Sequence, residues 1–258
     1  MTLKTALDSR GVATITLARP ELHNAFDDKL IAALTAHLEQ LAADPAVRVV
    51  VLGAEGRSFS AGADLNWMRR VAGYSEEENV QDAMGLATLM HTLDSLPKPT
   101  VARVQGAAFG GGVGLVACCD VVIASERASF CLSEVKLGLT PATISPYVVA
   151  KIGVSAARRY FLTAERFNAD TACRLGLVHE VTTEELLDDV VEGLVSDLLN
   201  NGPQAMREAK QLIADVAWQE ADTALLTDTA RRIAKLRGSA EGREGLSAFL
   251  DKRRPHWP

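Results

Sequence analysis

The stretch that decides the fold is Thr100-Val-Ala-Arg-Val104, which leads within two residues into Gly106-Ala-Ala-Phe-Gly-Gly-Gly-Val-Gly114. The first part is long enough for a buried strand and too short for a helix. The glycines allow a ligand to approach the main chain, and a helix that begins there points free N–H groups at that ligand. Glycines also serve the packing of a sheet against a helix. The stretch alone therefore leaves a structural and a binding interpretation open.

Strand-like and helix-like segments alternate on both sides of this stretch. Residues 11–17 alternate apolar with polar side chains, and residues 47–52 and 121–124 are short apolar runs typical of buried strands. A helix is predicted to begin at Asp27, with apolar side chains at helical spacing. This rhythm predicts crossover connections and a largely parallel, buried sheet, so the predicted fold class is α/β. The apolar positions of the helix are Leu30, Ile31, Leu34, Leu38 and Leu41.

The second half of the chain has a different pattern. From about Thr183 onward only helices are predicted, over residues 186–198, 205–216 and 221–235. These helices carry broad apolar faces and have no strands of their own to cover. We expect them to pack onto the core or onto a neighbouring subunit.

Composition excludes several classes of protein. The chain has 258 residues, of which 48% are hydrophobic and 23% charged, and this excludes a disordered or fibrous chain. A net charge of −6 argues against a nucleic-acid partner. The longest uncharged stretches, residues 104–119 and 137–150, are shorter than the roughly 18 residues of a membrane span. The first residues lack the apolar run of a signal peptide, which predicts a cytoplasmic protein with no membrane partner.

The cysteines and histidines do not form a metal-binding pattern. The four cysteines show no CxxC spacing and are predicted to be buried thiols, and the five histidines show neither HxxxH nor HxH spacing. No metal site is therefore expected. The cysteines are Cys118, Cys119, Cys131 and Cys173.

The glycine loop does not fit the nucleotide-binding motifs. A dinucleotide fingerprint needs glycines at relative positions 1, 3 and 6. Gly110 and Gly112 meet the first two requirements, but relative position 6 is Leu115. A P-loop is excluded because the chain contains no Gly-Lys-Ser/Thr.

A second loop of small residues, Ser58-Phe-Ser-Ala-Gly-Ala-Asp-Leu65, follows the apolar run at 47–52. Two N–H groups from two such loops can hold one carbonyl oxygen, which makes an oxyanion hole the surviving interpretation. One donor of this kind contributes about 3–4 kcal/mol to the stabilisation of a developing oxyanion.

The paired loops Ser60-Ala-Gly-Ala-Asp-Leu65 and Gly106-x-x-x-Gly-Gly-Gly112 resemble the two signature loops of the crotonase (enoyl-CoA hydratase/isomerase) superfamily. Three more segments resemble its other motifs, so that the resemblance covers essentially the whole chain. They are Arg19-Pro20-x-x-x-Asn24-Ala25, Ala172-x-x-x-Gly176-Leu-Val178 and Glu244-Gly-Leu-Ser-Ala-Phe249-x-x-Lys252-Arg253.

This resemblance implies a crotonase-like spiral of ββα units followed by a helical C-terminal trimerisation region. We place the acyl-CoA-binding and catalytic core at residues 1–190, and the region for oligomerisation and active-site covering at residues 191–258. The implied partners are an acyl-CoA thioester substrate and further copies of the chain, in a homotrimer or a dimer of trimers. No cofactor is implied, because CoA arrives as part of the substrate.

Closer similarities narrow the branch of the family. The segments 59–68, 130–135 and 138–146 are similar to bacterial methylglutaconyl-CoA and isohexenylglutaconyl-CoA hydratases. The last of them replaces a generic Pro-Gly-x-Gly-Gly segment. The implied activity is hydration of 3-methylglutaconyl-CoA or isohexenylglutaconyl-CoA, in leucine or acyclic terpenoid catabolism.

By motif position, the backbone N–H groups of Ala63 and Gly111 are implied to form the oxyanion hole, and Glu134 is implied to be the catalytic carboxylate. A typical hydratase of the family has a second glutamate, but its position here is Gly114. We therefore expect Glu134 to act largely alone, with its pKa raised by apolar neighbours. Gly114 is expected to widen the pocket, and a distal carboxylate of the substrate is a candidate to replace the absent glutamate.

Substrate contacts are implied along both loops and at the two ends of the chain. Trp67 is expected in the acyl pocket or, alternatively, in the core, and Ser133 either steadies Glu134 or caps a turn. Lys252 is a candidate for phosphate contacts from a neighbouring subunit. The alternatives to a hydratase are a double-bond isomerase, a thioester hydrolase and a non-catalytic acyl-CoA binder. The predicted substrate-contacting residues are His23, Asn24, Ala25, Ala61, Asp64, Leu65, Trp67, Gly110, Gly114, Ser133 and Lys252.

Overall fold

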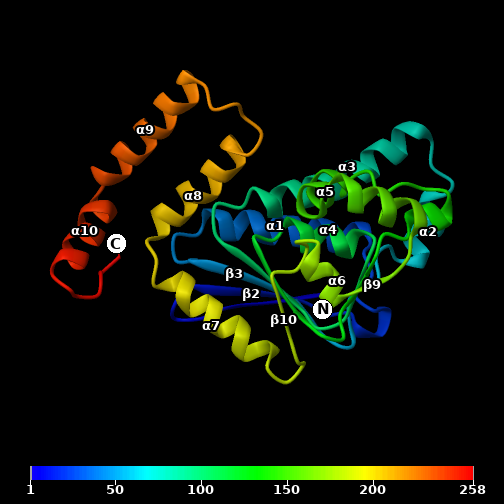
Figure 1. Cartoon of the computed structure of the whole chain (residues 1–258). Helices are drawn as coiled ribbons and strands as arrows, with labels where there is room; N and C mark the ends of the chain where they lie inside the picture. Colours follow the sequence, from blue (N-terminus) through cyan, green and yellow to red (C-terminus); the bar gives the residue numbers. More distant parts are fainter. Residues whose placement is uncertain (1, 258) are drawn as a thin grey trace.

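The computed structural model describes residues 2–257 and is built around a six-stranded sheet with the strand order β1-β2-β3-β5-β7-β10 (Figure 1). From β2 to β10 every neighbouring pair is parallel, and only β1 pairs antiparallel, with β2. The strands are β1 Leu3–Leu7, β2 Val12–Leu17, β3 Val49–Ala54, β5 Thr100–Val104, β7 Val121–Ser125 and β10 Glu180–Thr182.

The predicted strands are confirmed within two residues, and β5 has the predicted bounds. All six residues of β3 are buried, which is why they read as a continuous apolar run. β1 has a single buried residue, Leu3, and therefore carries no apolar pattern.

A second, small sheet has the order β4-β6-β8-β9. Its first three strands follow β3, β5 and β7 in the chain, and each such pair leads into a helix, so that ββα units repeat along the chain as expected. The strands are β4 Ser58–Ser60, β6 Ala107–Phe109, β8 Ser129–Cys131 and β9 Phe167–Asn168. The helices are α1 Asp28–Ala43, α2 Leu65–Val71, α3 Glu76–Asp94, α4 Gly111–Cys118, α5 Ser145–Thr163, α6 Ala169–Arg174, α7 Leu187–Leu199, α8 Pro203–Val216, α9 Thr223–Arg237 and α10 Ala240–Leu250, with 3-10 turns η1 Pro20–Leu22 and η2 Glu134–Leu137.

Helix α1 shows how local sequence fixes an element. The side chain of Asp27 accepts a hydrogen bond from the N–H of Leu30 and caps the helix, which begins at Asp28. The apolar residues of its predicted stripe are buried apart from Leu41, which is partly buried. The helix packs this stripe against the sheet.

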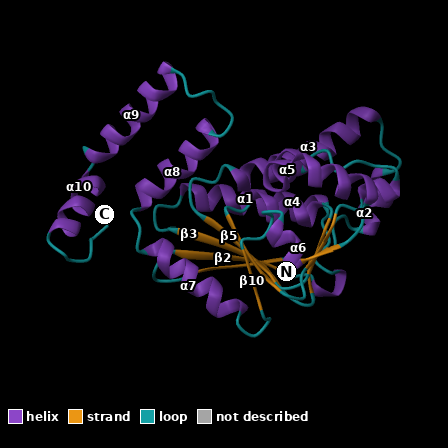
Figure 2. Cartoon of the chain, in the orientation of Figure 1, coloured by secondary structure: helices purple, strands orange, loops and turns teal. Residues whose placement is uncertain are grey.

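The main sheet is covered on both faces (Figures 1 and 2). Helices α1, α3, α4 and α5 lie over one face, and the larger apolar core lies beneath them. Helix α7 covers the other face, where its buried Leu187, Val191 and Val195 pack against Val49 and Ile123. The domain boundary at residue 190 stays a prediction, and α7 runs across it.

The last three helices, α8 to α10, form an arm that stands apart from the sheets (Figure 1). Helix α8 is tied to the core by Lys210, whose ammonium lies 2.8 Å from the carboxylate of Asp120. Glu241 of α10 is only 5% exposed, and its two carboxylate oxygens accept hydrogen bonds from the N–H groups of Gln204 and Ala205. A single buried carboxylate therefore caps α8 and holds α10 against it.

Two further features bear on the predicted classes. Within residues 2–257, no helix combines the length and the apolar character needed to cross a membrane. The same part of the chain contains no cluster of three or more His, Cys, Asp and Glu side chains suited to a metal ion. The four cysteines are free; Cys118, Cys119 and Cys131 are buried and Cys173 is partly buried.

The cap on α8 predicts that removing a carboxylate oxygen of Glu241 lowers the stability of the protein. Glu241→Gln turns one acceptor oxygen into an NH2 group that faces a backbone N–H. The free energy of unfolding is expected to fall by about 1–3 kcal/mol in urea titrations. Glu220→Gln, at an exposed position between α8 and α9, should stay within about 0.5 kcal/mol of the wild type. Equal stability of the two variants would contradict the cap.

Candidate active site

Three loops meet where the parallel strands β4, β6 and β8 end. β4 pairs with β6, and β6 pairs with β8, so that their carboxyl ends lie at one edge of the small sheet. Ala63 follows β4, Gly111 follows β6 and Glu134 follows β8. The three residues predicted to carry out the chemistry therefore come from three neighbouring strand ends.

The first loop is held by a bridge between Phe26 and Ala63. The N–H of Phe26 donates to the carbonyl of Gly62 at 2.6 Å, and the N–H of Asp64 donates to the carbonyl of Phe26 at 2.7 Å. These bonds use the carbonyl of Gly62 and the N–H of Asp64, on either side of Ala63. The N–H of Ala63 therefore points away from Phe26. Within residues 2–257 that N–H has no hydrogen-bond acceptor.

The second loop places Gly111 at the first position of α4, where a backbone N–H has no partner inside the helix. Gly110 precedes it with φ +50° and ψ −121°, a backbone conformation that an L side chain rarely adopts. The N–H of Gly110 donates to the carbonyl of Cys131 at 2.9 Å, which fixes the loop to β8. The positive end of the α4 dipole adds to the attraction for negative charge at this point.

The two loops touch through their glycines. A Cβ added at Gly62 would lie 3.1 Å from the carbonyl oxygen of Phe109, and one added at Gly112 would lie 2.8 Å from the carbonyl oxygen of Ser60. The main chains therefore approach more closely than side chains would allow. This close approach of the two loops agrees with the predicted oxyanion hole, in which the N–H groups of Ala63 and Gly111 would hold one carbonyl oxygen.

Glu134 presents its carboxylate to the second loop. A Cβ added at Gly110 would lie 3.2 Å from its Oε1. Its Oε2 is buried and has no hydrogen-bond partner within residues 2–257. Burial raises the pKa of Glu134 above its ordinary value, as expected from its apolar neighbours. An unpaired, desolvated carboxylate of this kind is suited to accepting and returning a proton.

The comparison with known proteins matches this arrangement. Residues 8–258 match the family described as enoyl-CoA hydratase/isomerase. The chain belongs to the enoyl-CoA hydratase/isomerase family.

Individual relatives cover almost the whole chain. It is 35% identical over 250 residues to the 2,3-dehydroadipyl-CoA hydratase of Escherichia coli, which covers 95% of this chain and 94% of that one. It is 34% identical over 252 residues to the 1,2-epoxyphenylacetyl-CoA isomerase of the same organism, at 96% and 95% coverage. A crystal structure of an enoyl-CoA hydratase from Shewanella pealeana is 48% identical, with a TM-score of 0.96 over 100% of this chain and 96% of that one. The predicted crotonase-like fold is thereby confirmed, and enoyl-CoA hydratase/isomerase activity on an acyl-CoA thioester is supported.

The N-terminal family motif acts as a tie between elements. Asn24 is fully buried; its side-chain amide donates to the carbonyls of Glu55 and Ser58, and its Oδ1 accepts from the N–H of Arg19. The His23 ring bonds the hydroxyl of Ser58 at 3.1 Å. These contacts fix the position of β4, from which the first loop begins.

Asp64 is held by the same motif. Its Oδ1 caps α2 by accepting from two backbone N–H groups, and its Oδ2 lies 3.4 Å from the guanidinium of Arg19. Arg19 also pairs with Asp27 at 2.8 Å, and its side chain is only 12% exposed. Arg19 therefore pairs with one carboxylate on each strand of the Phe26–Ala63 bridge, because Asp27 follows Phe26 and Asp64 follows Ala63. Its role was missed at the sequence level, because its partners lie 8 and 45 residues away.

The remaining loop residues divide by accessibility. Ala61, Ala63 and Leu65 are exposed, whereas Ala25 and Asp64 are buried. The N–H of Ala61 donates to the carbonyl of His23. Alternate residues of the first loop are therefore open to a ligand. Their contacts to CoA stay predictions.

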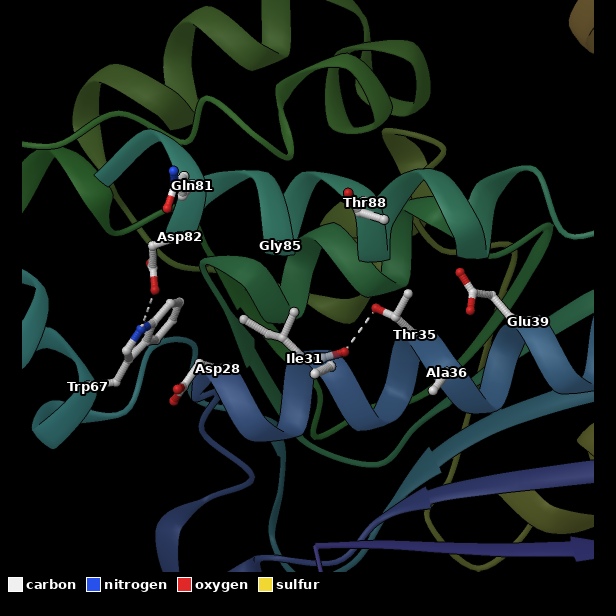
Figure 3. Close-up of a pocket in the computed structure, with 11 residues that line it drawn as sticks. Asp28, Ile31, Thr35, Ala36, Glu39, Trp67, Gln81, Asp82, Gly85 and Thr88 are labelled. Carbon is white, nitrogen blue, oxygen red and sulfur yellow. Dashed lines mark hydrogen bonds between the residues drawn. The ribbon is translucent and has the colours of Figure 1, made fainter. Parts of the chain in front are cut away.

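Trp67 lies on α2 and points toward α3 (Figure 3). Its indole N–H donates to Asp82 at 3.0 Å, and the ring lines a surface groove formed by residues of α1, α2 and α3. Only 8% of the residue is exposed. Its place in the acyl pocket stays a prediction; the core alternative agrees with its burial.

Gly114 was expected to widen the pocket, and this expectation is wrong. A Cβ added there would lie 2.3 Å from Cγ2 of Ile144 and 3.1 Å from Sδ of Met90, both of which are buried. The side chain of Ile144 takes up the space that the glycine leaves. A contact between residues so far apart in the chain has no signal in the sequence pattern.

Two other predicted residues have few contacts in this chain. The hydroxyl of Ser133 neither caps η2 nor bonds the Glu134 carboxylate within residues 2–257. Lys252 is exposed and follows α10 in the arm, with φ +53°. Its contact with CoA from a neighbouring subunit stays a prediction.

The geometry at Gly110 predicts a catalytic defect. Gly110→Ala forces a side chain into a positive-φ position and against Oε1 of Glu134, so kcat should fall by about tenfold or more. Gly153→Ala is the matched control, because Gly153 has φ +72° and nothing within 4 Å of an added Cβ. Both variants should lose thermal stability, but only the first should lose turnover of an enoyl-CoA. A similar kcat for both would show that Glu134 does not depend on Gly110.

Proposed function

We propose that this chain is a hydratase that adds water to a 2-enoyl-CoA thioester whose acyl group carries a second carboxylate. Its substrate is then 3-methylglutaconyl-CoA or isohexenylglutaconyl-CoA. CoA is part of the substrate, and the proposed chemistry uses no further cofactor.

The observation that carries the proposal is the Glu134 carboxylate. It is desolvated, its Oε2 is unpaired within residues 2–257, and it lies beside the loop that supplies the Gly111 N–H. A buried carboxylate oxygen without a hydrogen-bond donor is costly to the folded protein, which favours a role in which a ligand or water becomes the partner of Oε2.

One carboxylate is sufficient for the whole addition. The N–H groups of Ala63 and Gly111 hold the thioester oxygen, and Glu134 takes a proton from a water molecule as the water oxygen bonds to C3. The double-bond electrons move onto the thioester as an enolate. Glu134 then returns its proton to C2, the thioester carbonyl re-forms, and both new bonds lie on the same face. The raised pKa of Glu134 suits it to both proton transfers.

The second carboxylate of the substrate is inferred from the second glutamate that the site lacks. Position 114, where a typical family hydratase has its other glutamate, is glycine. A relative at 35% identity is named for 2,3-dehydroadipyl-CoA, a thioester whose acyl group also ends in a carboxyl. Leu137 and Leu139, both 58% exposed just after Glu134, offer apolar surface for the carbon chain.

A double-bond isomerase is the second candidate. Allylic proton transfer needs only an oxyanion hole and one carboxylate, and one relative is named as an isomerase. The oxygen of the product separates the two reactions, because only a hydratase incorporates solvent oxygen.

We also propose that the protein assembles as a homotrimer or a dimer of trimers through the arm formed by α8 to α10. Trp218, Phe249 and Leu250 in this arm are 84%, 81% and 77% exposed, an amount of apolar surface typical of an interface. Assembly through the arm places Lys252 near a neighbouring chain.

The substrate proposal is tested by the rates of two thioesters. Turnover of 3-methylglutaconyl-CoA should exceed that of crotonyl-CoA by roughly tenfold or more in kcat/KM, because crotonyl-CoA brings no second carboxylate. The measurement follows loss of the enoyl thioester absorbance, with mass analysis of the product formed in H2 18O. Labelled product supports the hydratase, and unlabelled rearranged product supports the isomerase. Equal rates for a thioester in which a methyl amide replaces the distal carboxylate would overturn the assigned role of that carboxylate.

Glu134→Gln should abolish catalysis without harming the fold. We expect kcat to fall by about 10²–10⁴-fold, because the amide cannot carry the proton. A carboxyl with a raised native pKa lowers stability as pH rises from its unfolded pKa through its native pKa, and glutamine is free of this loss. The variant should therefore melt at the same temperature as the wild type, or higher, at pH 7.

The pH profile gives a separate test of the same group. In the wild type, kcat/KM should fall on the acid side with a midpoint above the ordinary glutamate pKa of 4.5, because Glu134 must be ionised to take the proton from water. A midpoint at or below the ordinary value would mean that another group controls the rate.

A further inference from the structure

Helix α4 carries both the oxyanion donor and the position of the absent glutamate. Gly111 and Gly114 are three residues apart and lie on neighbouring parts of one helix face. The Cα–Cβ bonds of a helix lean toward its N-terminus, so a side chain at 114 would lean toward the turn that begins at Gly111, where the thioester is proposed to bind. This is the direction from which a second carboxylate would act.

That direction is closed by Ile144. Its Cγ2 lies 2.3 Å and its Cβ 3.0 Å from the position of a Gly114 Cβ, and Ile144 itself is 1% exposed at the start of α5. The 2.3 Å approach is far inside van der Waals contact. Met90 of α3, with its Sδ at 3.1 Å, flanks the same space.

The sequence departs from the family pattern in the same region. The segment 138–146, which contains Ile144, stands where the resembling family has a glycine-rich Pro-Gly-x-Gly-Gly segment. In this chain Gly114 has no side chain, and the large side chain of Ile144 fills the space beside it. The space between α4 and α5 is therefore filled from the α5 side, by a group that cannot carry a proton.

We propose that Ile144 is a specificity-determining residue that closes the α4 side of the acyl site to any second enzyme carboxylate. This inference rests on the proposed function and deepens it. Among residues 2–257, Glu134 is then the only carboxylate that reaches the acyl group. The enzyme favours substrates that bring their own carboxylate, and it hydrates simple enoyl thioesters slowly.

The steric part is tested by stability alone. Gly114→Ala should lower Tm by roughly 4 °C or more in the wild type, because one added methyl overpacks this contact. Ile144→Val keeps a Cγ2 methyl and Ile144→Ala removes it. The loss should therefore persist in the Ile144→Val background and shrink by at least about half in the Ile144→Ala background. An equal Tm loss in all three backgrounds would overturn the steric coupling.

The catalytic part is tested by placing a glutamate at 114. Gly114→Glu with Ile144→Ala should raise the ratio of kcat/KM for crotonyl-CoA to that for 3-methylglutaconyl-CoA by about tenfold or more over wild type. The matched control, Gly114→Glu with Ile144→Val, should show no such rise. An unchanged ratio in a folded Gly114→Glu/Ile144→Ala enzyme, or the same rise in both double variants, would overturn the role of Ile144 in specificity.

A failure of the proposed function can be told apart from a failure of this inference. If wild-type enzyme turns over neither thioester, the proposed function fails and the specificity role fails with it, whereas the Tm series still decides the steric coupling. If Gly114→Glu alone folds with wild-type Tm, Ile144 does not close this direction, whatever the substrate.

Discussion

The site depends on the side-by-side pairing of three very short strands, β4, β6 and β8. Each strand contributes only three residues, yet their parallel register sets three loops at one edge and allows two main chains to touch through glycine. No single loop contains a complete site. Within residues 2–257, one loop gives an N–H without an acceptor, the second gives another N–H with a helix dipole behind it, and the third gives a carboxylate whose Oε2 has no donor. A shift of one residue in this register would separate all three.

Much of the main sheet could be predicted from the sequence, because its strands are long enough to show a pattern. β3 is apolar throughout, β5 has three apolar residues among its five, and β2 alternates. The strands of the small sheet are too short to show a period, so only the small-residue loops that follow them signalled the site. Glu134 and the two loops were found by motif and the raised pKa by its apolar neighbours. Arg19 and Ile144 were missed because each acts through contacts across the fold rather than through a local pattern.

The charged groups around the site fall into two kinds. Arg19, Asp27 and Asp64 satisfy one another, and Asp64 also satisfies the first turn of α2, so they hold the first loop in place and have little capacity left for chemistry. Glu134 is the opposite case, because its surroundings desolvate it and offer Oε2 no donor within residues 2–257. The paired carboxylates therefore act as scaffold, whereas the unpaired Oε2 fits the proposed role of Glu134 as a proton carrier. Gly110 leaves room for the Glu134 carboxylate, because a Cβ there would lie 3.2 Å from Oε1.

Helix α4 has a further consequence for the dynamics of the site. Every residue from Gly112 to Cys118 is buried, so the helix has no solvent-facing side through which it could move or fray. The hydrogen-bonded amides in its interior are expected to exchange with deuterium only when the surrounding core opens, whereas the amides of α9, which has no buried residue, are expected to exchange from local openings. The proposed oxyanion donor at Gly111 is thus attached to a helix whose other residues are all buried, which favours a donor geometry that is set before a thioester binds.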